Sequence, residues 1–175
     1  MRVVWIRGVA TVLAATLAAG ACDQLLRREL PLPTAEEARA FYANASGVTD
    51  VELNGNVVEV RVRQPLDQLR RGGSLWARVG PYIYLFTPGT RDLFDEYPGV
   101  AAVRVITISP GGTEIARATL LRETMNDILW RRSLSLLSHA LHEGTRRPSR
   151  LEDLVNWGES HTEYVYNPTF VPEKH

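Results

Sequence analysis

The feature that most constrains the fold of this chain is an alternation of apolar and polar residues on both sides of Asn54-Gly55. The run VTDVELNGNVVEVRVRQP, residues 48–65, changes polarity at almost every step, which is typical of strands with one buried face. Its second half separates two sets of residues onto opposite faces: Val58, Val60 and Val62 against Glu59, Arg61 and Arg63. Asn-Gly between two such runs is the strongest short-range hairpin signal. We therefore expect two antiparallel strands with one face on a core and the other in water.

A second hairpin is expected in residues 100–121. The segments VAAVRVITIS and EIARATLL alternate in the same way, and the turn SPGGT joins them. The glycine pairs Gly72-Gly73 and Gly111-Gly112 do not stand in the G-x-x-x-x-G-K context that cradles a phosphate. They therefore predict turns and no nucleotide site.

Helices are expected on both sides of the hairpins. Two capping boxes open short helices: Thr34 with Glu37 for residues 34–45, and Ser149 with Glu152 for residues 149–158. The longest helix is predicted over 123–144, and it ends at Gly144. Its apolar stripe has helical spacing and predicts a face toward the core: Trp130, Leu134, Leu137 and Leu141.

Residues 74–98 leave two structures open. Their apolar side chains recur at three- and four-residue spacings, which favours a helix. Pro81 and Pro88 argue against an uninterrupted one, and PYIYLF taken alone is also compatible with a strand. We expect two helical pieces broken near Pro88-Gly89.

These elements predict an α+β fold in one globular domain, residues 34–175. The four strands of the two hairpins would form an antiparallel sheet with helices mainly on one face. A helical C-terminal part follows, and the tail from residue 161 is expected to be extended. An apolar content of 45% and a charged content of 23% are ordinary for a globular protein.

The N-terminus has the layout of a secretory signal. Arg2 and Arg7 precede the apolar run VATVLAATLAAGA, whose small residues stop directly against Cys22, the only cysteine of the chain. The segment Ala19–Cys22 resembles the bacterial lipoprotein signal, although Ala19 stands where leucine is usual. The resemblance implies a signal peptide over 1–21, a lipidated Cys22 at the mature N-terminus, and a tether over 22–33. The alternatives are an ordinary signal peptide or an uncleaved anchor.

Lipidation of Cys22 would account for an unpaired cysteine in an exported protein. The tether DQLLRRELPLP reaches at most roughly 40 Å, so the domain would stay near its membrane. Asp23 resembles the signal by which lipoproteins of enteric-type bacteria remain in the inner membrane. We therefore expect a location in the cell envelope, facing the periplasm or the exterior, with the inner membrane favoured over the outer.

The charge balance and the motifs argue against several classes of function. The charges of twenty basic and twenty acidic residues cancel, so the chain lacks the positive field of a dedicated nucleic-acid binder. In HALHE, His139 and His142 lie three apart on one side of a helix, with Glu143 beside them, but the spacing matches no zincin pattern. We interpret these residues as weak metal candidates on a polar helix face, and we predict no metal, cofactor or catalytic residue.

Five arginines cluster around one end of the longest predicted helix and are candidates for binding an anionic partner or lipid headgroups: Arg131, Arg132, Arg146, Arg147 and Arg150.

The sequence thus predicts a non-enzymatic envelope lipoprotein with a binding, assembly or structural role. Its expected partners are the membrane, through the lipid, and an envelope protein. Two alternatives stay open. One is a small metal-dependent or histidine-based hydrolase around His139 and His142. The other is a small-ligand-binding lipoprotein that uses the apolar residues 82–86.

Overall fold

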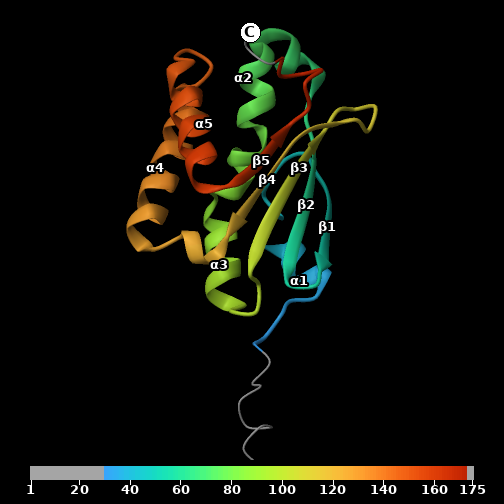
Figure 1. Cartoon of the computed structure of the whole chain (residues 1–175), viewed down its shortest axis with the longest axis vertical. Coiled ribbons are helices and arrows are strands. Elements are labelled where there is room, and N and C mark those ends of the chain that lie inside the picture. Colours follow the sequence, from blue (N-terminus) through green and yellow to red (C-terminus); the bar gives the residue numbers. More distant parts are fainter. Residues whose placement is uncertain (1–29, 173–175) are drawn as a thin grey trace, which may run out of the picture.

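The computed structural model describes residues 30–172. The predicted signal peptide, Cys22, Asp23 and most of the tether lie outside the described residues, as do residues 173–175 and the side chains of Leu66 and Arg71. The described chain forms a five-stranded sheet with helices packed on one side of it (Figure 1). The predicted α+β class is confirmed.

Both predicted hairpins are present. Strands β1 (Val48–Asn54) and β2 (Val57–Arg63) pair antiparallel, and Asn54 lies opposite Val57 across the turn. Gly55 has φ 65°, a conformation that only glycine adopts readily, so Asn-Gly acts as the sequence predicts. Strands β3 (Ala102–Ile108) and β4 (Glu114–Leu121) form the second antiparallel pair.

The predicted sheet of four antiparallel strands is wrong in its detail. The strands lie in the order β1-β2-β3-β4-β5, and the contact between the two hairpins, β2 against β3, is parallel. The chain between β2 and β3 contains two helices, which is long enough for a crossover that brings β3 back in the direction of β2. The sheet is therefore mixed.

A fifth strand, β5 (Glu163–Tyr166), comes from the tail that was expected to be extended. It pairs antiparallel with β4 and forms one edge of the sheet (Figure 1). The Tyr166 hydroxyl donates to Glu159 Oε1 at 2.9 Å and lies 2.7 Å from the Tyr82 hydroxyl. Arg78 Nη2 donates to the same carboxylate oxygen at 2.6 Å. This network fixes β5 to helices that precede it in the chain.

The crossover consists of α2 (Leu66–Leu85) and α3 (Pro88–Glu96), so the expectation of two helical pieces is confirmed and the strand alternative is wrong. Pro81 lies inside α2 without ending it. The backbone departs from helical geometry at Gly73 instead, where φ is 56°. Pro88 begins α3, because proline suits the first helical position and Thr87 caps the helix by accepting from the Thr90 backbone N–H at 3.2 Å.

The remaining helices depart from the predictions at their ends. Helix α1 (Ala35–Ala40) has the predicted capping box of Thr34 and Glu37 but is shorter than expected. A 3₁₀ turn, η1 (Arg122–Thr124), precedes α4 (Asp127–Glu143), so the long helix starts at the Asn126 cap. Helix α5 (Ser149–His161) continues past residue 158. The predicted capping box of Ser149 and Glu152 is wrong, because Pro148 occupies the cap position and no side chain caps this helix.

The core lies between the sheet and the helices. Val58, Val60 and Val62 are buried together with residues of α2, its C-cap and α5, among them Tyr82, Leu85, Phe86, Leu151 and Leu154. The predicted apolar stripe of α4 is only partly confirmed. Trp130 and Leu137 are buried, but Leu141, in the last turn of the helix, is 59% exposed.

Candidate functional site

The structure gives the weak metal candidates other partners. His139 Nδ1 lies 3.8 Å from Glu143 Oε1, whereas His142 Nδ1 lies 2.8 Å from the Ser138 carbonyl oxygen one turn earlier. Glu143 Oε2 accepts from Arg147 at 3.1 Å and Arg150 at 3.5 Å. Partial burial opposes ionisation of Glu143, but these cations outweigh it and hold its pKa below the ordinary value. No group of three His, Cys, Asp or Glu residues within residues 30–172 is arranged to hold a metal.

The five predicted arginines are not brought together. Arg131 and Arg132 lie in the second turn of α4, whereas Arg146, Arg147 and Arg150 follow its last turn. Arg131 and Glu143 are twelve positions apart on the helix, which corresponds to roughly 18 Å. Arg147 and Arg150 are moreover paired with Glu143. The five arginines therefore lie on two separate surfaces and do not form one binding patch.

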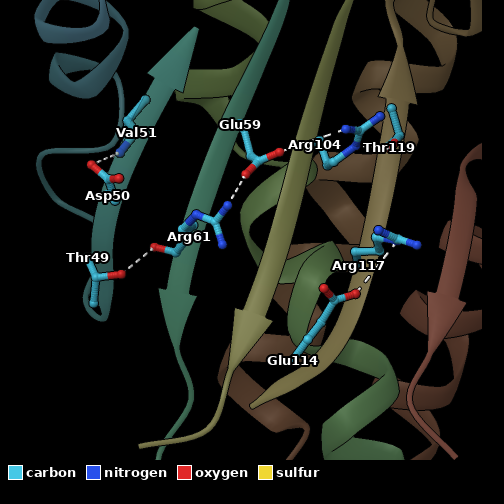
Figure 2. Close-up of polar contacts among 9 residues, drawn as sticks. All are labelled: Thr49, Asp50, Val51, Glu59, Arg61, Arg104, Glu114, Arg117 and Thr119. Carbon is cyan, nitrogen blue, oxygen red and sulfur yellow. Dashed lines mark hydrogen bonds and ion pairs between the residues drawn. The ribbon is translucent and has the colours of Figure 1, made fainter. Parts of the chain in front are cut away.

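The face of the sheet that is turned away from the helices carries paired charges (Figure 2). Glu59, in the centre, contacts Arg61 Nη2 at 2.6 Å and Arg104 Nη1 at 3.8 Å, and its side chain is only 8% exposed. Arg104 Nε also donates to Thr119 at 3.1 Å, and Arg117 pairs with Glu114 at 3.6 Å. Glu59 is shared by two arginines and Glu114 pairs with the third, so these five residues are paired among themselves and leave one net positive charge.

A cavity beside the end of β2 has a different character. Gln64 follows β2 directly, and its backbone N–H donates to the Ile108 carbonyl at 2.8 Å, which continues the parallel pairing with β3. Its side chain is on the helix side, where Nε2 donates to the Trp76 carbonyl at 2.7 Å. Because that carbonyl can only accept, the amide orientation is fixed and Oε1 points the other way. Gln64 is 5% exposed, and Oε1 has no hydrogen-bond partner.

The cavity has a volume of about 290 Å³. Gly80 gives Gln64 its space, because a Cβ at position 80 would lie 2.9 Å from Gln64 Oε1 and 3.1 Å from Thr107 Cγ2. The walls come from the loop before β1, the end of β2, and helix α2, and they include Gly47, Val62, Gln68, Trp76, Ile83 and Tyr84. A buried acceptor without a partner costs free energy unless a water or a ligand donates to it.

A second hollow of about 430 Å³ adjoins the first on the other side of Tyr84. Both are lined by Ser46, Ile83, Tyr84 and Leu141, and the second hollow adds Phe41, Tyr42, Ala45, Pro88 and Leu137. Arg63 is the only charged residue among those that line the two, and strand alternation places its side chain on the open face with Arg61. We call this combined feature the Tyr84 groove.

Helix α2 presents different residues to the core and to the groove. Tyr82, Leu85 and Phe86 are fully buried, which excludes them from a ligand site and corrects the expectation that residues 82–86 as a block would bind a ligand. Ile83 and Tyr84 line the groove instead. The Tyr84 hydroxyl donates to the Ser46 carbonyl at 2.7 Å. Burial raises the pKa of Tyr84, so its side chain is neutral at physiological pH where it lies between the two hollows.

Sequence reasoning missed Gln64 because nothing local distinguishes it. It follows a strand and precedes a proline, as many polar residues do, and its missing partner depends on the groups that the fold places around it, among them Gly80. Ser133, which stands near His139 in the sequence, is fully buried and donates to the Leu129 carbonyl while accepting from Trp157 Nε1. The first contact lies within α4, and the second holds α4 against α5.

No family model, no curated protein and no solved structure matches this chain. None of the helices in the described part of the chain has the length and apolar character needed to cross a membrane.

Proposed function

We propose that the protein is a membrane-anchored lipoprotein of the cell envelope, and that its folded domain binds a ligand in the Tyr84 groove without catalysing a reaction. The anchor is the lipid on Cys22, and the tether over 22–33 keeps the domain near the membrane surface. This location rests on the N-terminal sequence. Asp23 favours the inner membrane.

The binding role is carried by one observation, the unpartnered Oε1 of Gln64 in a cavity that is open beside an apolar hollow. Buried polar groups in folded proteins are almost always hydrogen-bonded, so an unpartnered acceptor beside a cavity is a place where a water or a ligand can donate a hydrogen bond. His139, Arg147 and Arg150, in contrast, already pair with Glu143.

The anchor is tested by the intact mass and the detergent partitioning of the protein made in a bacterium, beside a Cys22→Ser variant. We expect a mature chain that starts at Cys22 and carries acyl groups, and the variant should lose them. An unmodified thiol at Cys22, or retention of the first 21 residues in the wild-type protein, would refute the lipoprotein assignment.

The binding site is tested by native mass spectrometry of the protein released gently from membranes. We expect a retained small molecule that is lost in Leu141→Asp, which places a charge at the groove. Ile128→Asp is the matched control, because Ile128 lies on the same helix and is 68% exposed but does not line the groove. A bare wild-type protein, or an adduct that survives Leu141→Asp, would count against this site.

A further inference from the structure

The ligand of the Tyr84 groove is a single-chain lipid with an uncharged, hydrogen-bond-donating head, such as a monoacylglycerol; we propose this from the chemistry of the two hollows. The inference rests on the proposed binding role and adds the class of ligand. Three features define this ligand: an apolar body, a head that donates a hydrogen bond, and no charge.

The apolar body follows from the larger hollow. Its lining is made of aromatic, aliphatic and small uncharged residues, including Phe41, Ile83, Leu137 and Leu141. Leu141, in the last turn of α4, is 59% exposed and lines both hollows, so a large apolar side chain faces the groove with most of its surface uncovered. A hydrocarbon chain laid against these residues would be removed from water together with them.

The donor head follows from the smaller hollow. Gln64 Oε1 is fixed as an acceptor by the bond from Nε2 to the Trp76 carbonyl, so the group that meets it must carry an N–H or O–H. A carboxylate or phosphate ester cannot satisfy it, because two acceptors would face each other. A hydroxyl or amide head can.

The absence of charge follows from the residues of both hollows. No acidic residue lines them, and the one basic residue, Arg63, belongs by strand alternation to the open face of β2. A charged head in the cavity would lose its water without gaining an ion-pair partner, which is costly. The volumes, about 290 and 430 Å³, suit one narrow chain and a small head and are at the low end for ligand pockets.

The experiment uses the lipidated full-length protein in lipid nanodiscs and three photoactivatable probes with the same acyl chain. The first is a monoacylglycerol, the second is the same molecule with both free hydroxyls methylated, and the third is the fatty acid at pH 8. After irradiation, the labelled peptides are identified by mass spectrometry. We expect the monoacylglycerol to label peptides from the Tyr84 groove, and each of the other two probes to label them roughly tenfold less. The methylated probe lacks the hydrogen-bond donor, and the fatty acid carries a charge that would lose its water in the groove.

Two variants and a matched control separate a bound ligand from chance contact. Leu141→Asp should reduce labelling by the monoacylglycerol roughly tenfold, whereas Ile128→Asp should leave it unchanged. Gln64→Leu, which removes the acceptor, should bring monoacylglycerol labelling down to the level of the methylated probe and leave the methylated probe unaffected. The comparison of the two probes in one variant is independent of any change in stability.

Equal labelling by the fatty acid or by the methylated probe would overturn the assigned class. So would labelling that persists in Leu141→Asp. If the native protein retains a small molecule that is lost in Leu141→Asp, yet none of the three probes labels the groove, the binding role stands and the lipid class is wrong. If it retains none and no probe labels the groove, both proposals fail.

Discussion

The backbone of Gly158 in α5 lies directly against the aromatic ring of Tyr82 in α2. A Cβ built at position 158 would come within 2.3 Å of Tyr82 Cδ1 and 2.5 Å of Cε1. Tyr82 is fully buried and its hydroxyl is held by Tyr166, so the ring cannot turn away. This contact sets how closely the two helices approach.

We predict that Gly158→Ala destabilises the protein by about 1–3 kcal/mol, the usual cost of overpacking a core. The intrinsic preference of alanine for helices, about 1 kcal/mol, is too small to compensate for the clash with a fixed ring. The free energy of unfolding from denaturant titration measures the change. Gly111→Ala is the control, because its Cβ would have only Ser109 Oγ nearby at 3.8 Å. Equal stability of the two variants would contradict the contact.

Arg122 connects η1 to the end of α3. Its guanidinium donates to the carbonyl oxygens of Phe94 at 2.6 Å, Tyr97 at 2.5 Å and Val100 at 2.7 Å. We predict that Arg122→Met costs about 2 kcal/mol, because three carbonyls lose a charged donor. Arg122→Lys should restore little, since an ammonium cannot span three acceptors. Full rescue by lysine in thermal unfolding would show that charge alone matters here.

Glu59 joins two arginines on the open face of the sheet. Its side chain is nearly buried beneath Arg61 and Arg104, whose own side chains are 42% and 38% exposed. We predict a coupling free energy of about 0.5–1 kcal/mol between Glu59 and Arg61 in a Glu59→Gln, Arg61→Met double-mutant cycle. The coupling is small because Arg61 is partly exposed, so solvent screens the ion pair. The coupling should decrease in 1 M salt. A coupling that is zero at low salt would mean that burial of Glu59 depends on packing alone.

Buried tyrosines predict how stability depends on pH. Burial raises the pKa of Tyr42, which bonds to Thr90 at 3.0 Å, and also the pKa values of Tyr82 and Tyr166. Tyrosine in the unfolded chain ionises near pH 10. Stability from these neutral phenols is therefore complete below about pH 10 and is lost as the pH rises beyond it.

The free energy of unfolding should accordingly stay level from pH 8 to 9.5 and fall above pH 10. Tyr42→Phe should be less stable at pH 8, where its hydrogen bond is lost, but its alkaline decline should be shallower by up to about 1.4 kcal/mol per pH unit. Parallel declines in the variant and the wild type would show that Tyr42 ionises normally in the folded state.

The local elements followed from short-range patterns. Asn54-Gly55 fixed a hairpin, and the T-x-x-E box of Thr34 and Glu37 fixed a helix start, because each pattern satisfies backbone groups within a few residues. Ser149 and Glu152 show the same pattern without forming the box, because Pro148, and not Ser149, occupies the cap position of α5. Pro81 did not end α2, since its surroundings in the core outweigh the local preference.

By itself, the sequence determined the class of fold, the two hairpins, the helices and the N-terminal segment that predicts a lipid anchor. Only the tertiary structure decided that β2 runs parallel to β3, that the tail adds β5, and that Gln64 Oε1 is buried without a partner. Alternation and capping depend on neighbours a few residues apart. Strand order and an unpartnered acceptor depend on groups that the crossover brings together from distant parts of the chain.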